Sequence, residues 1–216
     1  TGDITSLAVH DSDNRVVGEV STAGVVTVTT YNAAGSITST TQYATPLTTA
    51  QIVSLGSTPT LSALQAQIRP SYADQLNLTL YDTGNRPVAW VTPETIYNYG
   101  NEYVQQVSTV TYDASGNIVA TQQYAQTLTV QQATELGSAP TLDELHRMLA
   151  IAAGGQTRLT VYDANERLVA TVDANGYVTT TSYDSTGNIT ATTEYATGLN
   201  AGQIASLGDT PTLAEL

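Results

Sequence analysis

The feature that most constrains the fold of this 216-residue chain is an internal repeat. Landmark residues return at offsets of 81 and then 71 residues. The matching sets are Tyr31, Tyr112 and Tyr183; Leu55-Gly56, Leu136-Gly137 and Leu207-Gly208; and Pro59, Pro140 and Pro211. Chance does not produce so many coincident landmarks, so the sequence predicts an array of similar units that stack on one another.

The offsets predict a unit of about 71 residues and three copies of it, covering 1–80, 81–161 and 162–216. The middle copy carries ten extra residues between Tyr81 and Tyr112, which we place around 93–100. The chain starts at Thr1 without a Met and stops inside the pattern, so we expect it to be a piece of a longer polypeptide.

Each unit has a predicted β half that is rich in Thr and Val. In 167–183, two runs of β-branched residues flank Asp173-Ala-Asn-Gly176. This pattern predicts a hairpin, because Gly accepts a positive φ and β-branched residues suit strands. A third strand is expected to end at Tyr195 and to have one face drier than the other.

Each unit also has a predicted helical half with two short helices. The first helix is expected to begin at a capping box and to end at a glycine. The capping pairs are Thr48/Gln51, Thr129/Gln132 and Asn200/Gln203, the glycines are Gly56, Gly137 and Gly208, and the N-caps of the second helix are Thr60, Thr141 and Thr212. One apolar stripe per second helix, Leu61/Leu64/Ile68 or Leu142/Leu145/Leu149, is expected to pack on the β half. The predicted class is therefore α+β: antiparallel hairpins in a continuous sheet, with a helix pair in each unit.

The β half resembles the tyrosine–aspartate (YD) repeats of the RHS family, whose pattern is Tyr-Asp, two variable residues, Gly, then Arg or Asn and an apolar residue. The matching residues are Tyr81, Asp82 and Gly84; Tyr112, Asp113 and Gly116; Tyr162 and Asp163; and Tyr183, Asp184 and Gly187. The first copy departs from the pattern with His10-Asp11 and Tyr31-Asn32, and Glu166 stands where Gly is usual.

The resemblance implies a scaffold made of stacked β-hairpins. In related bacterial toxins such a ribbon closes into a shell around a toxic domain, and in related animal proteins it is part of a cell-adhesion ectodomain. The physical role expected for the Tyr is to lay its ring on the neighbouring hairpin with its hydroxyl in water. The Asp is expected to accept backbone N–H bonds within the turn, while Gly or Asn supplies the positive φ.

Composition excludes several classes of function. The chain has no Cys, and all six of its cations are Arg, so it has no thiol nucleophile, no cysteine-ligated metal and no phosphate-binding lysine. A net charge of −13 disfavours nucleic acid as a partner, and no apolar run is long enough to span a bilayer. We therefore expect neither nucleic-acid binding nor membrane insertion by this segment.

Catalytic and metal sites have weak support. His10 and His146 occupy different parts of the unit, neither recurs, and no Gly-x-Ser-x-Gly motif is present. The Asp residues fall in turns, where a structural role is favoured over weak calcium binding because the loop spacings of calcium sites are missing. We expect no enzyme activity, no cofactor and no metal.

One aromatic cluster is not explained by the repeat. Trp90, Tyr97, Tyr99 and Tyr103 lie in or beside the insertion, and insertions in repeat arrays often lie on the binding face. These residues are candidates for stacking on sugar rings, against the alternative that the insertion only extends a hairpin.

The function predicted from the sequence is a non-catalytic scaffold segment of a large secreted or surface-exposed bacterial YD/RHS-type protein, part of a toxin or toxin-delivery shell. The alternative is an adhesin stalk that binds glycans or other cell-surface partners. The expected partners are neighbouring repeats of the same chain, together with an encapsulated toxin domain in the first case or cell-surface glycans in the second. The expected location is extracellular or on the bacterial cell surface.

Overall fold

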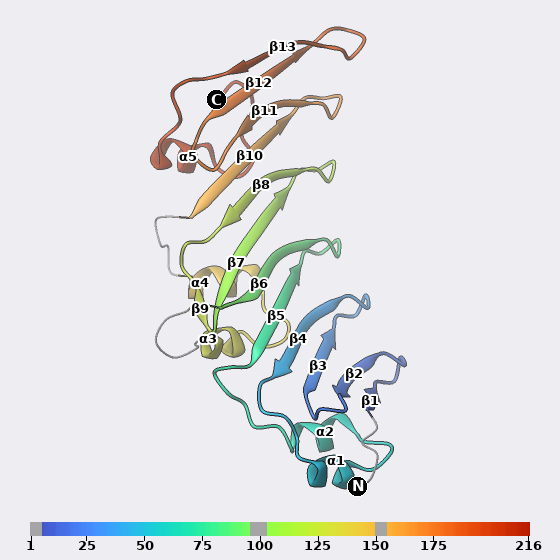
Figure 1. The fold of residues 1–216 in the computed structure, drawn as a ribbon. Helices are drawn as coiled ribbons and strands as arrows, with labels where there is room; N and C mark the ends of the chain where they lie inside the picture. The colour runs from blue at the N-terminus through green and yellow to red at the C-terminus, as the bar shows by residue number, and fades with distance from the viewer. Residues whose placement is uncertain (1–5, 96–102, 150–154) are drawn as a thin grey trace. The chain divides into compact units, whose positions relative to one another are not determined.

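The computed structural model describes residues 6–95, 103–149 and 155–216 (Figure 1). Its strands are β1 Leu7–His10, β2 Val16–Val20, β3 Val26–Tyr31, β4 Ile37–Tyr43, β5 Gln75–Tyr81, β6 Pro87–Thr95, β7 Tyr103–Tyr112, β8 Ile118–Gln123, β9 Leu128–Thr129, β10 Gln156–Tyr162, β11 Leu168–Val172, β12 Val178–Tyr183 and β13 Ile189–Glu194. Its helices are α1 Thr49–Leu55, α2 Leu61–Gln65, α3 Val130–Glu135, α4 Leu142–Met148 and α5 Ala201–Leu207.

The described strands form one mostly antiparallel sheet of 13 strands. The strand order follows the chain from β1 to β13, except that β9 pairs with β7 off this path. Because the sheet is mostly antiparallel and the helices are few and short, the α+β class is confirmed. Among the described residues, no helix combines the length and the apolar composition needed to cross a membrane.

The chain divides into two compact units. Unit 1 contains residues 1–107 and 127–151, and unit 2 contains 108–126 and 152–216. The predicted repeat boundaries at 80 and 161 stay a prediction.

The core of unit 1 lies between the first strands and the helices α1 and α2. Leu64 of α2 is fully buried and packs with Val20, Val26 and Ile52, and Leu61 and Ile68 pack against this cluster. The predicted apolar stripe is therefore present, although α2 ends at Gln65 and Ile68 follows it in a turn. A Cβ on Gly18 of β2 would lie 2.8 Å from Leu64 Cδ2, so the glycine makes room for this leucine.

Unit 2 has a similar arrangement around α5. Leu159, Val172 and Val178 are buried on the sheet. Leu199 and residues of α5, including Ile204, pack against them. Burial of such side chains is the main stabilising contribution to a sheet with short helices on it.

The predicted helix ends are confirmed except at Thr212, where a turn follows and the expected second helix is not formed. All three first helices carry the capping box, with Thr48, Thr129 or Asn200 accepting from the backbone N–H of the glutamine three residues later. Thr60 and Thr141 cap the second helices. Gly56, Gly137 and Gly208 have positive φ at the ends of the first helices.

Strands β6 and β7 contain nine and ten residues, whereas β2 and β3 contain five and six. Each is four residues longer than its counterpart, so the inserted residues lengthen this pair of strands. This observation favours the hairpin-extension alternative for the described part of the insertion. Tyr97 and Tyr99 lie outside the described residues.

The prediction for the last strand is wrong. All six residues of β13 are exposed, including Ile189 at 63%, so neither face is the drier one. The reason is that β13 pairs only with β12 among the described strands, and an edge strand without a covering layer leaves both faces in water.

Candidate functional site

Six hairpin turns at the position of the Tyr-Asp motif share one hydrogen-bonding pattern, which the turn that begins at Asp173 also has. The six motif turns begin at Asp11, Asn32, Asp82, Asp113, Asp163 and Asp184, and each joins two consecutive strands. Within each compact unit these turns lie at the same end of the hairpins (Figure 1). In the Asp163 turn, Oδ1 accepts the backbone N–H of Asn165 at 2.9 Å and that of Arg167 at 3.0 Å. Asn32 makes the same two bonds, to Ala34 and Ser36 at 3.0 and 2.9 Å, so the amide oxygen replaces the carboxylate oxygen here.

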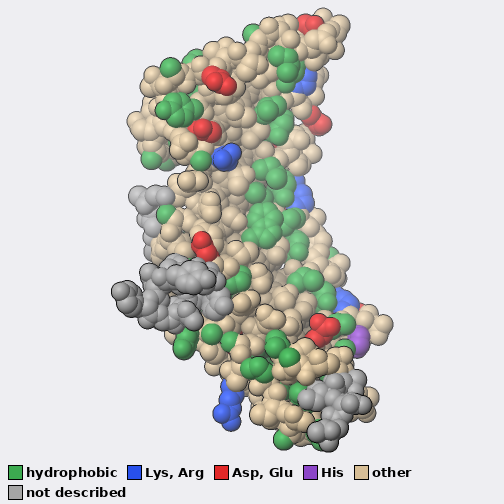
Figure 2. All heavy atoms as spheres, viewed as in Figure 1, with side chains coloured by type: hydrophobic (Ala, Val, Ile, Leu, Met, Phe, Trp, Pro, Cys, Tyr) green, Lys and Arg blue, Asp and Glu red, His purple; other side chains and the backbone are tan. Residues whose placement is uncertain are grey.

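The fifth residue of each turn binds the second carboxylate oxygen in five of the six cases. Arg15, Arg86 and Arg167 donate from Nε to Oδ2 at 2.7–2.8 Å, and Asn117 and Asn188 donate from Nδ2 at 3.1 and 3.0 Å. Figure 2 shows that charged side chains are few on this face and stand singly or in small groups among uncharged ones. The charged groups of the motif are therefore engaged inside the turn.

The fourth residue of each turn has a positive φ. This residue is Gly35, Gly116 or Gly187 in three turns, and Asn14, Asn85 or Glu166 in the other three, where φ is 60–61°. In the Asp82 turn the left-handed residue is Asn85, and Gly84 is the residue before it. Gly84 instead donates its N–H to Asp82 Oδ1 at 2.9 Å, a bond that any residue can make.

Arginine and tyrosine connect neighbouring hairpins. The guanidinium carbon of Arg15 lies 4.8 Å from the centre of the Tyr31 ring, and that of Arg167 lies 4.6 Å from the Tyr183 ring. Both distances are within the range of cation–π attraction. Each guanidinium therefore binds the aspartate of its own turn and also contacts the tyrosine ring of the next hairpin.

The tyrosine hydroxyls, which were expected to remain in water, also bond to backbone carbonyls of neighbouring strands. Tyr31 donates to the carbonyl of Val16 at 3.0 Å, and Tyr183 donates to the carbonyl of Leu168 at 2.8 Å. Tyr81 donates to the carbonyl of Ile37, across the pairing of β4 with β5, at 3.0 Å. The ring therefore reaches the backbone of an adjacent hairpin and holds it.

The turn geometry lowers the pKa of the aspartates below the usual value. For Asp163 and Asp184 the main cause is the side chain of the fifth residue, Arg167 or Asn188, and for Asp82 it is the backbone N–H of Arg86. A carboxyl group with a lowered pKa is a weak proton acceptor, which suits a structural role better than general-base chemistry.

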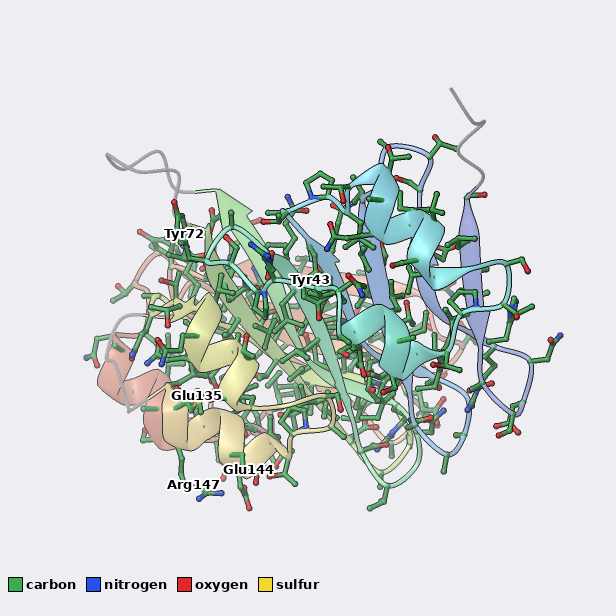
Figure 3. All side chains as sticks on the ribbon, turned by 90° about the horizontal axis from the view of Figure 1, so that it is seen from below. Tyr43, Tyr72, Glu135, Glu144 and Arg147 are labelled. Atoms are coloured by element: carbon green, nitrogen blue, oxygen red, sulfur yellow. The ribbon has the colours of Figure 1, made fainter. Side chains whose placement is uncertain are left out.

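A groove of about 720 Å³ lies on the sheet in unit 1. Its lining comes from the strands, including Thr30, Ser39, Thr41 and Tyr43; from the segment after α2, including Pro70 and Tyr72; and from α3, including Gln131 and Glu135. In Figure 3, Tyr43 lies between the helix pair α1/α2 and the helix pair α3/α4. The residues that line the groove include two carboxylates, Asp74 and Glu135, and no cation.

The two carboxylates of the groove are held by neighbouring groups. Asp74 is 4% exposed, and its two oxygens accept the backbone N–H groups of Ala44 and Ser71, each at 2.8 Å. Glu135 Oε1 accepts from the amide of Gln131 at 3.0 Å. Burial, followed by the charge of Asp74, raises the pKa of Tyr43. Asp74 thus ties the start of β5 to the end of β4, which is a structural task.

The predicted aromatic cluster is only partly described. Trp90 is half-buried on β6, where it pairs with Thr79 of β5, and Tyr103 begins β7. The tyrosines that line the groove are Tyr43 and Tyr72, which the sequence did not predict as site residues. A signal for Tyr72 was present, because the residue 81 positions later is Ala153 and the repeat therefore does not explain the tyrosine.

His10, at the end of β1, and His146, in α4, are exposed. Within the described ranges, no group of three or more His, Asp or Glu side chains is arranged to hold a metal ion.

Residues 162–198 match the family model described as RHS Repeat, so the resemblance to YD/RHS repeats is confirmed there. No curated protein matches the chain. Among solved structures, "Crystal Structure of TcdB2-TccC3" is 13% identical with a TM-score of 0.49, and "Crystal Structure of TcdB2-TccC3-Cdc42" is 12% identical with a TM-score of 0.48. Each comparison covers 90% of this chain and 8% of the other, so the chain spans about a twelfth of those chains.

Proposed function

We propose that this chain, in which residues 162–198 are an RHS repeat, is a non-catalytic scaffold segment of a secreted or surface-exposed bacterial YD/RHS-type protein. In this proposal the chain is a tandem array of hairpins with a helix pair in each unit, and it forms part of the wall of a toxin or toxin-delivery shell. Its partners are the neighbouring repeats and an enclosed toxin domain.

The observation that carries the proposal is that the chemical groups of the motif are used to build structure. The turn carboxylates are bonded to backbone N–H groups and to the fifth residue of the turn, as for Asp163 and Arg167. The tyrosine hydroxyls are bonded to backbone carbonyls, as for Tyr183 and Leu168. A motif whose polar atoms are engaged locally gives shape and stiffness, and it leaves no group placed for nucleophilic or acid–base catalysis.

The test uses the natural polypeptide that contains this sequence, in a protease-protection assay. If the chain forms part of an enclosing wall, the segment of the polypeptide that lies inside the wall resists the protease in the unaltered protein. The variant Asp163→Ala removes both backbone bonds and the Arg167 ion pair from one turn, and it is expected to raise the rate of cleavage of the enclosed segment.

The control is Ser185→Ala, at an exposed turn position. It is expected to leave the cleavage rate unchanged. The shell is contradicted if, in the unaltered protein, every neighbouring segment is cleaved at the rate of a free peptide. Electron cryomicroscopy of the same polypeptide shows directly whether these strands belong to a closed wall.

A second candidate function is favoured by the groove in unit 1. Exposed and half-buried tyrosines, hydroxyl groups and amides converge there, and such groups recognise sugars by stacking and hydrogen bonding. In this alternative the chain is an adhesin module, and the absence of cations among the residues that line the groove favours neutral glycans over anionic ones.

The discriminating experiment is binding of the chain to an array of neutral and anionic glycans. Tyr72 is 68% exposed, so Tyr72→Ala is expected to abolish any binding by the groove without unfolding the chain. Tyr177→Ala, at a tyrosine that is 49% exposed and outside the groove, is the matched control. Absence of glycan binding by the unaltered chain eliminates this alternative.

A further inference from the structure

The groove of unit 1 carries negative charge that the neighbouring side chains do not balance. Asp74 and Glu135 line it, and its lining contains no arginine or histidine. Within the described part of the chain, ion pairs form at the hairpin turns, and neither Asp74 nor Glu135 takes part in one. Their hydrogen-bond donors are backbone N–H groups and the Gln131 amide, which are neutral. A cationic ligand would therefore complement the charge of the groove.

The hydroxyl of Tyr43 is a second group in the groove that the scaffold does not use. The motif tyrosines donate their hydroxyls to backbone carbonyls. The hydroxyl of Tyr43 has no hydrogen-bond partner among the described residues. Its counterpart Tyr124 bonds to the side chain of Thr109, and the counterpart of Thr109 in the first copy is Val28, which cannot form this bond. The first copy therefore leaves a half-buried phenol hydroxyl available to a ligand.

The charge of Asp74 acts on the space around Tyr43. Burial, followed by this charge, raises the pKa of Tyr43, so a second negative charge is disfavoured there and a positive charge is favoured. Tyr72, which is 68% exposed, adds another aromatic ring to the lining. Carboxylates attract ammonium groups, and tyrosine faces attract them as well. The groove therefore suits a ligand that carries an ammonium group.

The strands that line the groove favour a sugar over an extended peptide as the carrier of this ammonium group. They are β3, β4 and β5, and each is paired with a neighbouring strand on both sides. A peptide therefore finds no open backbone edge to which it could add as a strand. The ligand must bond to side chains instead, and the lining offers the hydroxyls of Thr41 and Ser138 and the amide of Gln65. Such groups match the hydroxyl groups of a sugar.

We propose that the groove binds glycans that carry free amino groups, with the ammonium group attracted by Glu135 and Asp74 and a sugar ring stacked on Tyr72. The proposal rests on the adhesin function given above as the second candidate, and it names the class of glycan. The absence of lining cations disfavours anionic glycans, and the two carboxylates favour amino sugars over neutral sugars. The volume of about 720 Å³ lies within the range of roughly 300–1,000 Å³ found for small-ligand sites.

The experiment titrates the chain with two ligands by calorimetry: short glucosamine oligomers, and N-acetylglucosamine oligomers of the same length and linkage. The titration is done at about pH 6, where Asp and Glu are ionised. Salt at about 0.15 M screens the general attraction between a polycation and the net charge of −13. The free amines are expected to bind at least about tenfold more tightly than the acetylated ligand, because acetylation removes the charge.

Three variants assign the preference to the groove. Glu135→Gln removes one charge at an exposed position and is expected to lower the preference for the free amine to about threefold or less. Glu194→Gln makes the same change on β13, outside the groove, and is expected to keep the full preference. Tyr43→Phe removes only the hydroxyl and is expected to weaken both ligands by a similar factor, about twofold to tenfold.

Three results overturn the inference: equal affinity for the two ligands, a preference that Glu135→Gln leaves unchanged, or binding of oligolysine as tight as that of the glucosamine oligomer. If neutral glycans on the array bind the groove without any preference for free amines, the adhesin function stands and only the amino-sugar assignment fails. If no glycan binds, the adhesin function fails as well. The two failures are therefore distinguishable, and the scaffold is tested separately by protease protection.

Discussion

Four glycines with positive φ allow a test of whether close contact between two backbone segments requires a glycine in each compact unit. A Cβ added to Gly176 would lie 2.1 Å from the carbonyl oxygen of Leu199, and the N–H of Leu199 donates to the Gly176 carbonyl at 2.8 Å. Gly208, in the same unit, has φ of +67° and nothing within 4 Å of its Cβ position. Gly176→Ala and Gly208→Ala both place an alanine at a positive φ, of +86° and +67°, but only Gly176→Ala adds the clash.

The two costs can be estimated separately. An alanine held in a backbone region that is open mainly to glycine costs about 1–3 kcal/mol, which is the full expected loss for Gly208→Ala. Relief of the clash in Gly176→Ala moves the backbone away from Leu199 and weakens its hydrogen bond, which adds about 1–3 kcal/mol. We expect a total loss of about 2–6 kcal/mol in the free energy of unfolding for Gly176→Ala, larger than the loss for Gly208→Ala.

The assay is urea unfolding followed by far-ultraviolet circular dichroism, with the free energy extrapolated to water. Unit 1 offers an independent matched pair: at Gly24 the Cβ would lie 2.3 Å from the Leu47 carbonyl oxygen, and at Gly56 nothing lies within 4 Å. Equal losses for Gly176→Ala and Gly208→Ala, repeated for Gly24→Ala and Gly56→Ala, would refute the reasoning, because the clash is present in only one member of each pair.

Three further predictions concern side chains. Gln105 is fully buried with neither amide atom bonded, so Gln105→Met is expected to raise the free energy of unfolding by about 1–3 kcal/mol in the same assay, and a decrease would mean that the amide is needed. The Arg167 side chain, followed by backbone N–H groups, lowers the pKa of Asp163 in the folded state, so its stabilisation is present above the usual pKa of 3.8 and is lost as the pH falls. Asp163→Asn is therefore expected to flatten the dependence of unfolding free energy on pH between about pH 6 and about pH 3, and an unchanged slope would contradict the assignment. Leu64→Ala is expected to cost about 2–5 kcal/mol, against under about 0.5 kcal/mol for Val53→Ala at a position that is 73% exposed, and similar losses would show that α2 does not carry the core of unit 1.

The turn motif and the helix caps were predictable because their partners lie within four residues of one another. The capping box at Thr129 and Gln132, and the turn bonds from Asp163 to Asn165 and Arg167, follow from spacing and residue type alone. The strand runs were predictable for a similar reason, since β-branched residues flank a glycine turn that fixes the pairing locally.

The candidate groove was not predictable from the sequence. Its lining combines strand residues such as Tyr43 with Tyr72 and with Glu135 of α3, which are far apart in the chain. No local pattern states which helix lies next to which strand, and the repeat masks Tyr43 because the same landmark recurs at Tyr124 and Tyr195. Only the departures from the repeat, such as Tyr72, carry information about a site that belongs to a single copy.

The middle copy shows where sequence and tertiary structure each decide. The repeat offsets place Gln105 in register with Gly24 and Gly176, and the sequence alone determines that ten residues are added there. Tertiary structure decides what the addition does: β6 and β7 grow longer, β7 pairs with β9 so that Gln105 lies opposite Leu128, and the amide becomes buried without a bond. Short-range hydrogen bonds can be predicted from the types and spacing of residues close in the sequence. Burial and long-range strand pairing depend on which surfaces come into contact once the chain has folded.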